Sequence, residues 1–407
     1  MNATPTEPLS LVIDPDYLRD PHTVHARLRT AGSAHPLLLP NGTRAWVVTR
    51  YGDVRAALTD PRLAKDAVRV REIIARQLAE TGQRVQMSHI YPRHMLNGDP
   101  PDHSRLRRLV AKPFTQRRIQ QLRPRVLEIT EDLLDAMPTD RPADLIGSFA
   151  FQLPITVICE LMGVPLERQA DFRRWTGTLL SGGQLAAVEK AARELNGYMA
   201  ELIAAKRARP AGDLLSSLVH VDEDGDRLTE EELLGTAVLL LIAGHETTVN
   251  LIGNGVLALL CAPDQWELLR GDMALLPRAV EELLRYGSPV RLATYRYTTE
   301  PVRIGDTVIP EGELVLLGLG SANRDPDQFD EPRLLDVSRS AGGHLALGHG
   351  IHYCLGAPLA RLEGEVAIGR LIERFPRTRL AVSPEQLRWR ESVIMQGMEE
   401  LPVYLGR

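Results

Sequence analysis

A long apolar segment near the middle of the chain limits the folds that are open to it. Residues 233–261 form an apolar run long enough to cross a bilayer as a helix. Polar residues interrupt it, among them His245, Glu246, Thr247, Asn250 and Asn254. Ionisable groups at membrane depth are costly and rare, whereas a helix that is apolar on nearly all sides is typical of a large protein core. We therefore interpret the segment as a buried central helix rather than as a membrane span.

The residues that flank this segment predict where the helix begins and ends. Thr229 precedes Glu230, Glu231 and Glu232, so Thr229 can act as the N-cap while Glu232 reaches back to close a capping box. Pro263 cannot continue a helix and marks its expected end.

The remainder of the chain predicts a mainly helical protein. Helical periodicity continues through residues 120–137 and 189–207. The first 20 residues are rich in Pro and Asp and are expected to form a surface coil. No Gly/Ser-rich linker divides residues 21–407, which we expect to form a single domain.

Strands are expected to be few and to cluster near the two ends of the chain. Residues 44–49 have the composition of a strand, and a helix is expected to begin within residues 53–58. Residues 302–309 and 314–317 predict a hairpin around the turn at residues 310–312. The predicted fold class is therefore mainly α with small β-sheets.

Composition excludes several classes of function. Of the 407 residues, 44% are hydrophobic and 25% charged, as in ordinary soluble proteins. A net charge of -5 argues against nucleic acid as a partner. Three cysteines without a disulfide framework suit a reducing compartment. Residues 1–18 lack a basic region followed by an apolar core, so we expect no signal peptide and a cytoplasmic protein.

One cysteine lies in a setting that suggests chemistry. Cys354 is in a loop with Gly348, Gly350 and Gly356, whose missing Cβ atoms allow backbone N–H groups to approach the sulfur. Pro358 is well placed to open a helix, which would direct its positive end at Cys354. Both features favour the thiolate. A thiolate in a tight loop of amides is suited to ligating haem iron.

Other interpretations of the cysteines are weaker. Cys159 and Cys261 lie in apolar segments and are expected to be small buried hydrophobes. A zinc site formed by His349, His352 and Cys354 would need a further ligand, and no second cluster of Cys or His at ligand spacing is present in the sequence.

Residues 347–361 resemble the haem-ligand loop of the cytochrome P450 superfamily. The family usually has Phe where this chain has Leu347, and again near Leu335. The resemblance covers about residues 10–405. It implies a single-domain P450 fold in which haem b lies between a long central distal helix and the helix that follows Cys354. It is strongest for the soluble bacterial type that oxidises polyketides, macrolides and other secondary metabolites.

Residues 243–248, Ala-Gly-His-Glu-Thr-Thr, place an acid beside an alcohol within the apolar helix. They could form a solvent-facing polar stripe, or the threonine could bond back to the preceding turn. The hexapeptide also resembles the oxygen-activation motif of the family. The resemblance implies that Ala243 and Gly244 let the helix pass close to the haem. It assigns catalytic roles to Thr247, as a hydrogen-bond donor to oxygen, and to Glu246, as part of a proton relay.

A second motif, Glu282-Leu-Leu-Arg285, places an acid and a base on one helix face. Taken alone it could be an ordinary surface pair. The resemblance implies instead a buried structural ion pair that supports the cysteine loop.

Cofactor carboxylates need cations or strong donors. His103 and Arg107 share a helix face at i, i+4 spacing. The resemblance assigns these two residues, together with Arg296 and His352, to the haem propionates. It also places Gly348 among the residues that contact the cofactor.

Residues 103–118 are strongly basic and contain no acid. Such a run could be a solvated face or could bind RNA. By resemblance it borders the proximal haem face, where an acidic ferredoxin would dock. The proposed contacts are Arg105, Arg108 and Lys112. The sequence ends at Arg407, shortly after the cysteine loop, so we expect no fused reductase domain and expect electrons from a separate ferredoxin and ferredoxin reductase.

The resemblance also indicates which residues face the substrate. Besides Ala243, we nominate Leu292, Ala293, Ile394 and Met395. A mobile wall is expected within residues 65–96, including Gly82, Met87, His89, Ile90 and Tyr91. Aliphatic and Met side chains would suit a bulky, largely apolar substrate.

The leading hypothesis is a cytoplasmic haem-thiolate monooxygenase that uses O2 to hydroxylate or epoxidise such a substrate. A peroxide-driven oxygenase is an alternative, although peroxide chemistry would not need the pair Glu246 and Thr247. A non-enzymatic haem protein that senses a gas or carries a ligand is another. Nothing in the sequence requires more than a monomer.

Overall fold

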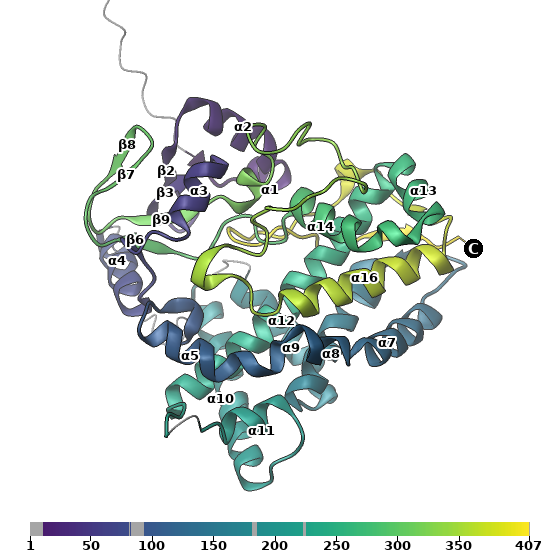
Figure 1. Cartoon of the computed structure of the whole chain (residues 1–407), viewed down its shortest axis with the longest axis horizontal. Helices are drawn as coiled ribbons and strands as arrows, with labels where there is room; N and C mark the ends of the chain where they lie inside the picture. The colour runs from purple at the N-terminus through teal and green to yellow at the C-terminus, as the bar shows by residue number, and fades with distance from the viewer. Residues whose placement is uncertain (1–10, 81, 83–92, 181–184, 223–224, 407) are drawn as a thin grey trace, which may run out of the picture.

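A computed structural model describes residues 11–80, 82, 93–180, 185–222 and 225–406 of the chain. Most of these residues are helical (Figure 1). The helices are α1 Pro15–Arg19, α2 Pro21–Ala31, α3 Tyr51–Ala57, α4 Ala67–Glu80, α5 Asp102–Ala111, α6 Gln116–Gln120, α7 Arg123–Ala136, α8 Gln152–Met162, α9 Gln169–Leu180, α10 Leu185–Ala208, α11 Leu214–Val219, α12 Glu230–Leu260, α13 Pro263–Gly271, α14 Leu276–Gly287, α15 Leu319–Ala322 and α16 Ala357–Arg374.

The strands are short and form small sheets, as expected for the predicted fold class. The main sheet has the order β1-β2-β3-β9-β6-β4, a second has the order β10-β11-β5, and β7 pairs with β8. The strands are β1 Leu11–Val12, β2 Ala34–Leu38, β3 Arg44–Val48, β4 Leu63–Ala64, β5 Ala143–Asp144, β6 Arg296–Thr298, β7 Val302–Ile304, β8 Thr307–Ile309, β9 Leu314–Leu317, β10 Arg379–Leu380 and β11 Pro402–Tyr404.

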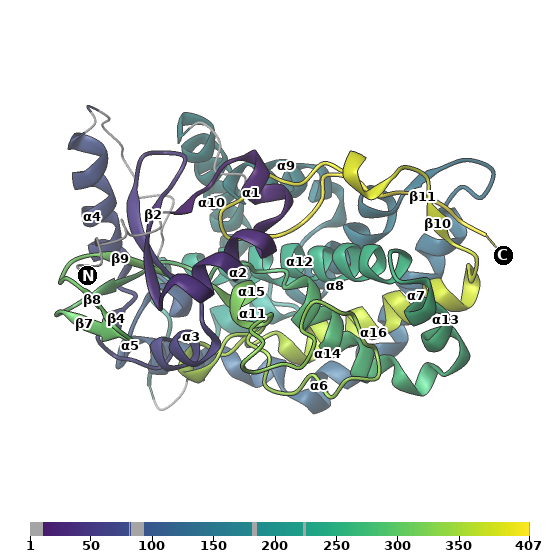
Figure 2. The same ribbon diagram turned by 90° about the horizontal axis from the view of Figure 1, so that it is seen from above.

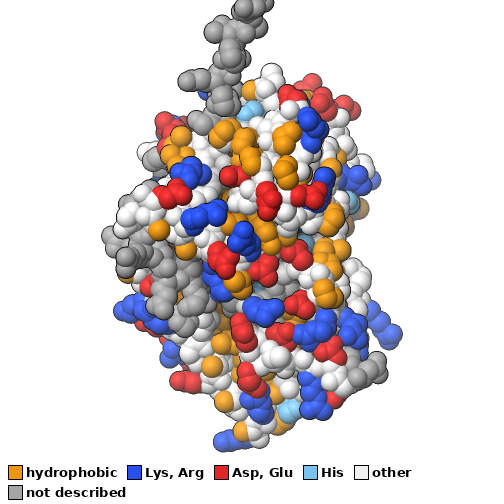
Figure 3. Space-filling view, turned by 90° about the vertical axis from the view of Figure 1, so that its left-hand side faces the viewer, with side chains coloured by type: hydrophobic (Ala, Val, Ile, Leu, Met, Phe, Trp, Pro, Cys, Tyr) orange, Lys and Arg blue, Asp and Glu red, His pale blue; other side chains and the backbone are white. Residues whose placement is uncertain are grey.

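The sheets lie at the two ends of the molecule. Figure 2 shows the main sheet with β7 and β8 at one end, β10 and β11 at the other, and helices between them. Figure 3 shows the sheet end of the molecule, where basic and acidic side chains are interspersed. The arrangement leaves α12 as the central helix of the helical part.

Helix α12 begins and is buried as predicted. The Thr229 hydroxyl accepts from the Glu232 N–H, and the Glu232 carboxylate accepts from the Thr229 N–H at 2.9 Å, which completes the capping box. The most apolar 18-residue stretch of α12 is 78% buried inside the protein. This burial agrees with a core helix, which has the length and composition of a membrane span but packs against protein.

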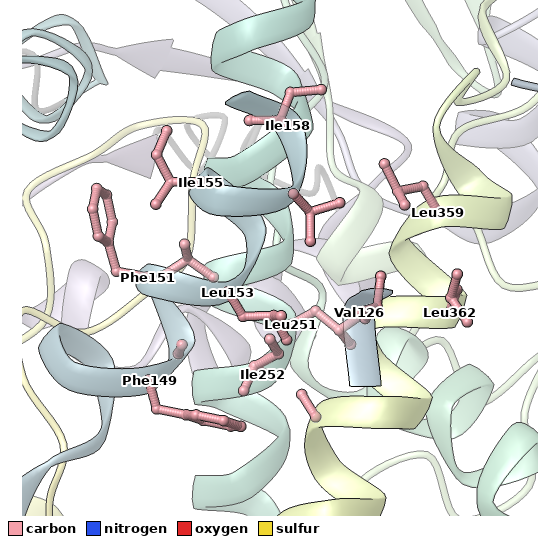
Figure 4. Close-up of a cluster of buried hydrophobic side chains, with 14 of the residues drawn as sticks. Val126, Phe149, Phe151, Leu153, Ile155, Ile158, Leu251, Ile252, Leu359 and Leu362 are labelled. Atoms are coloured by element: carbon pink, nitrogen blue, oxygen red, sulfur yellow. The ribbon is translucent and has the colours of Figure 1, made fainter. Parts of the chain in front are cut away.

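The core around α12 is built from helices α7, α8 and α16. Figure 4 shows Val126 of α7, Ile158 of α8, Leu251 of α12 and Leu359 of α16 within one cluster of buried apolar side chains. Helix α16 starts directly after the cysteine loop, so this packing fixes the loop relative to α12.

Two predictions about the strands and the first residues are wrong. Residues 11–19 are not coil, because Leu11 pairs with Leu37 in the main sheet and Asp14 caps α1 by accepting from the Tyr17 N–H. Leu11 and Tyr17 are each only 2% exposed, so apolar burial holds this segment against the sheet.

The predicted hairpin around residues 310–312 does not form either. β7 turns into β8 at Gly305, whose φ of +57° suits the left-handed turn. β9 is instead buried along its whole length and pairs with β3 in parallel and with β6 antiparallel. Predicted strand β3 is confirmed, and predicted helix α3 begins slightly earlier than expected.

Candidate active site

A cavity of about 510 Å³ lies between α12 and the loop that precedes α16. Helix α12 contributes Ala243 and Thr247 to its lining, and the loop contributes Leu347, Gly348 and Cys354. The predicted catalytic pair and the predicted ligand cysteine are therefore brought to one cavity, although they are far apart in sequence.

The loop holds Cys354 through its backbone. The Cys354 N–H donates to the Leu347 carbonyl at 2.8 Å. Gly348 and Gly350 have φ values of +77° and +72°, which the turn requires and which other residues rarely adopt. Helix α16 begins at Ala357, and Pro358 lies in its first turn as predicted.

The thiol of Cys354 is under opposing influences. Burial raises its pKa, while the N–H groups of Gly356 and Ala357 and the charges of Arg107 and Arg361 lower it. The N–H groups of the loop and of the start of α16 therefore favour the thiolate as predicted, but burial is the larger effect and keeps the pKa above its ordinary value. A bound metal ion deprotonates a coordinating thiol directly.

The other two cysteines do not line this cavity. Cys159 is buried in α8, as predicted, and burial raises its pKa to about 12. Cys261 is exposed rather than buried, because it follows the last residue of α12, where the helix reaches the surface. In the described part of the chain no group of three His, Cys, Asp or Glu residues is arranged to hold a metal ion.

The two small residues of α12 have different surroundings. Ala243 is exposed toward the cavity. Gly244 also lines the cavity, but a Cβ on it would lie 2.9 Å from the side chain of Ile158 in α8. Its missing side chain therefore permits the close contact between the two helices as well as access to the cavity.

Thr247 lines the cavity and also bonds back to its own helix. Its hydroxyl donates to the Ala243 carbonyl at 2.9 Å. The predicted bond to the preceding turn is therefore confirmed. It is compatible with a role in catalysis, since a hydroxyl that rests on a backbone carbonyl can still rotate to meet a ligand.

Glu246 is buried and ionised. Its carboxylate accepts from Arg390 Nη1 at 2.8 Å and from the Thr176 hydroxyl at 3.0 Å, and His245 Nε2 lies 3.5 Å away. Burial would raise the pKa of Glu246, but the neighbouring His245, Arg390 and Thr176 together lower it to about 2. Arg390 and Thr176 are functional neighbours that the sequence analysis missed.

The four residues predicted to bind propionates meet at the cavity, which all of them line. The rings of His103 and His352 lie 4.3 Å apart between centroids. Arg107 donates to the Tyr353 carbonyl at 2.7 Å, and Arg296 donates to the carbonyls of Leu63 and Leu58.

The donors of this cluster fit a dianionic ligand. Both ring nitrogens of His103, Nε2 of His352 and Nε of Arg296 are buried without a hydrogen-bond partner. Burial and the surrounding cations lower the pKa of His352 to about 2. Because unpaired buried polar atoms are costly, the cluster is suited to carboxylates, and the two propionates of haem would satisfy it.

Lys65 is a further cation at this cavity. Its side chain is buried at 3% exposure, lines the cavity and donates to the Thr294 hydroxyl. In the sequence, Lys65 was identified only as the first residue of the expected substrate wall. For a lysine between a short strand and a helix, the neighbouring residues in the sequence do not indicate that its side chain is buried.

The predicted ion pair of Glu282 and Arg285 is buried, with both side chains 0% exposed. The guanidinium donates to both carboxylate oxygens, at 2.6 and 2.7 Å, and to the Asn323 carbonyl at 2.9 Å. The Asn323 side chain then accepts from the Leu345 N–H, two residues before Leu347. The pair therefore supports the cysteine loop through Asn323.

The predicted basic docking residues are partly neutralised. Arg105 pairs with Glu232 and, at 2.8 Å, with Asp226. Arg108 pairs with Asp226 at 2.9 Å. The sequence run contains no acid, but the fold brings Glu232 of α12 and Asp226 of the preceding segment to it, so the charges of Arg105 and Arg108 are balanced. Lys112 follows directly after α5.

The predicted substrate residues are brought together except for one. Ala293, Ile394 and Met395 line the cavity. Leu292 does not; it is fully buried in a core cluster with Leu314 of β9. The side chain of Leu292 is therefore buried against strands of the main sheet rather than in the cavity.

The expected wall contributes through residues that differ from those named. Ala67, Val70, His94, Met95 and Leu96 line the cavity. Gly82 follows α4 and is not among the lining residues. Met87, His89, Ile90 and Tyr91 lie outside the residues that the structure describes.

Comparisons with known proteins agree with this geometry. The profile of the family described as Cytochrome P450 matches residues 267–395. Cytochrome P450 107B1 of Saccharopolyspora erythraea is 54% identical, over 97% of this chain and 98% of that protein. Cytochrome P450 monooxygenase PikC of Streptomyces venezuelae is 49% identical, over 95% and 92%.

The fold is shared with solved structures as well. The tirandamycin C-bound P450 monooxygenase TamI is 50% identical and superposes with a TM-score of 0.92, over 97% of this chain and 100% of that one. With this identity over nearly the whole length, the chain belongs to the cytochrome P450 family of haem-thiolate monooxygenases.

Proposed function

We propose that this P450 monooxygenase is a cytoplasmic enzyme that hydroxylates or epoxidises a bulky, largely apolar secondary metabolite of the polyketide or macrolide kind. One observation carries the proposal: Cys354 and the pair Glu246 and Thr247 line the same largely apolar cavity. Relatives support the substrate class. Proteins 44% and 42% identical to this chain are named Mycinamicin IV hydroxylase/epoxidase and 6-deoxyerythronolide B hydroxylase.

The cavity supplies the groups that the cofactor needs. We assign Cys354 as the thiolate ligand and His103, Arg107, Arg296 and His352 as donors to the propionates. When bound, haem supplies the redox-active iron at which O2 is reduced. The protein would hold the group from two directions, by the cysteine loop and by the cation cluster.

The residues of α12 would move protons toward the cavity. The Thr247 hydroxyl rests on the Ala243 carbonyl and can turn to donate to a polar atom in the cavity. Glu246 precedes Thr247 and also lines the cavity, and Arg390, whose side chain is 22% exposed, connects Glu246 to the surface. A proton from solvent would reach Glu246 when Arg390 releases it, and then pass to Thr247.

The substrate would be held mainly by apolar contact. The lining combines α9, α10, α12, the segment after α14 and the turn near the C-terminus. Its apolar side chains include Leu179, Leu195, Val238, Leu239, Ile242, Val290, Ala293, Ile394 and Met395. Such a lining binds bulky apolar molecules by burial.

Electrons would arrive from a ferredoxin and its reductase. Beside Cys354 the loop exposes Ile351, at 47%, and Tyr353, at 38%, so a partner could approach close to the cofactor from this face. Because Arg105 and Arg108 are largely paired, we expect this apolar contact to contribute beside the charges of the basic run.

The proposal is tested by turnover with a bacterial ferredoxin and reductase, reduced nicotinamide cofactor and a panel of macrolactones under ¹⁸O2. We expect product that carries one ¹⁸O atom and depends on the ferredoxin. The proposal would be contradicted if product formed only with added peroxide, or if the oxygen atom inserted into the product came from water.

A further inference from the structure

The buried ammonium group of Lys65 is not explained by the residues around it. Lys65 lies between β4 and α4. Its backbone N–H donates to Asp99 Oδ2 at 2.7 Å, and its Nζ donates to the Thr294 hydroxyl. A hydroxyl satisfies one donor but does not balance the charge, and an unbalanced buried charge is costly.

The surroundings add positive rather than negative charge. Burial, and after it the charge of Arg296, lower the pKa of Lys65 to about 7, while Asp99 raises it. The other acid that acts on Arg296 is Asp60, which is already paired with Arg62 at 2.7 Å. The cluster therefore has more buried cations than anions.

The guanidinium group of Arg296 is partly used by backbone carbonyls, so it is not fully available to bind an anion. Its Nη1 and Nη2 donate to the carbonyls of Leu63 and Leu58 at 2.9 and 3.2 Å, which leaves Nε without a partner. These bonds hold the chain just before Lys65. Arg296 thus positions the turn that presents the lysine, and Thr294, two residues away, orients its ammonium group.

We propose that Lys65 is a further cofactor-binding residue whose ammonium group, together with Arg296, binds one haem propionate. The lysine lies beside the donors assigned to propionates and lines the same cavity. A propionate there would balance the excess charge and complete the unpaired donor of Arg296. The inference rests on haem binding, which family membership shows, and not on the proposed substrate.

The test compares the haem-loaded Lys65→Met variant with the wild-type holoenzyme. The readouts are the rate of haem transfer to excess apomyoglobin and the midpoint potential of the iron. Loss of a charge-assisted hydrogen bond should speed haem release by about tenfold to a hundredfold. Loss of a nearby positive charge should shift the potential to more negative values, because the reduced state carries one more negative charge.

Two further variants separate charge from packing. Lys190→Met makes the same change on the solvent side of α10, where the side chain is 73% exposed, and should leave both readouts at wild-type values. Lys65→Arg keeps the charge and should hold the potential near wild type.

A variant that leaves the lysine in place tests the proposal even if Lys65→Met does not fold. Thr294→Val removes the hydroxyl that orients the ammonium group and should speed haem release by a few-fold. Wild-type release rates in both Lys65→Met and Thr294→Val would overturn the proposal. The proposal would also be overturned if Lys65→Met kept the wild-type release rate and potential but bound the carboxylate of myristate, a fatty acid, more weakly. The lysine would then bind the carboxylate of a substrate.

Discussion

At the scale of single residues, the chemistry of the cavity depends on which polar groups already have partners. Glu246 is committed to Arg390 and Thr176, whereas the Thr247 hydroxyl is held only by a carbonyl of its own helix. The threonine is therefore the group of the pair that is free to meet a ligand in the cavity.

Replacing Thr247 with Ala should uncouple electron consumption from product formation. Without the hydroxyl, proton delivery is misdirected, so we expect the fraction of electrons recovered in product to fall by about tenfold, with hydrogen peroxide released instead. Thr30→Ala is the control, because Thr30 makes the same bond to the carbonyl four residues earlier, on the exposed helix α2. Fully coupled turnover by Thr247→Ala would remove the role assigned to this residue.

The candidate residues that could be identified from the sequence are those that lie together in one short motif. Cys354 in its glycine loop and the neighbours Glu246 and Thr247 could be identified because each motif lies within a few positions. Their partners could not. Arg390 lies 144 positions from Glu246, and Lys65 lies 229 positions from Thr294. The pattern of residues within one segment does not indicate contacts between positions so far apart in the chain.

At the scale of helices and strands, burial decides what a motif does. The tetrapeptide Glu-Leu-Leu-Arg occurs twice, at residues 267–270 and 282–285. In α13 the side chains of Glu267 and Arg270 are 55% and 50% exposed, whereas in α14 both charged side chains are fully buried. Local spacing alone could not separate these two cases.

This repeat provides a matched pair of substitutions. Arg285→Met leaves Glu282 buried without its main partner and should cost about 3–5 kcal/mol of unfolding free energy. Arg270→Met removes an exposed pair and should cost about 0.5 kcal/mol or less. The measurement is the thermal unfolding midpoint of the two holoenzymes by circular dichroism. Equal shifts in both variants would show that the buried pair is not structural.

The contact between α16 and α12 contains an unusual acid. Glu363 of α16 is 0% exposed, and burial raises its pKa to about 8, with only the Thr248 hydroxyl acting to lower it. The group is therefore protonated in the folded protein at neutral pH, whereas in the unfolded chain it ionises near its ordinary value of 4.5.

This difference predicts a pH-dependent stability. Because the folded pKa is raised, the contribution of Glu363 to stability is full below about pH 4.5 and is lost as the pH rises toward 8. Glu363→Gln removes this dependence, so its unfolding midpoint should rise relative to wild type between pH 5 and 8, by the equivalent of about 2–4 kcal/mol. Glu201→Gln, on the exposed side of α10, is the control. A constant difference across this pH range would contradict the prediction.

At the scale of the whole molecule, the fold class and the central helix followed from the sequence, because amphipathic and capping patterns act within single elements. The pairing of β9 with β3 did not, since it joins residues about 270 positions apart that local turn signals cannot reveal. The balance of the basic run by Asp226 and Glu232 was hidden for the same reason. Fold and cavity chemistry were thus predictable, and long-range pairing was not.

The absorption spectrum of the purified protein, reduced and exposed to carbon monoxide, tests the central claim most directly. With Cys354 as the thiolate ligand, the wild-type protein should show the strongly red-shifted Soret band of thiolate-ligated haem, and Cys354→Ser should lose it. Cys261→Ser should keep the band, because Cys261 lies on the surface outside the cavity. A band at the position typical of histidine ligation in the wild-type protein, or no bound haem, would contradict the account.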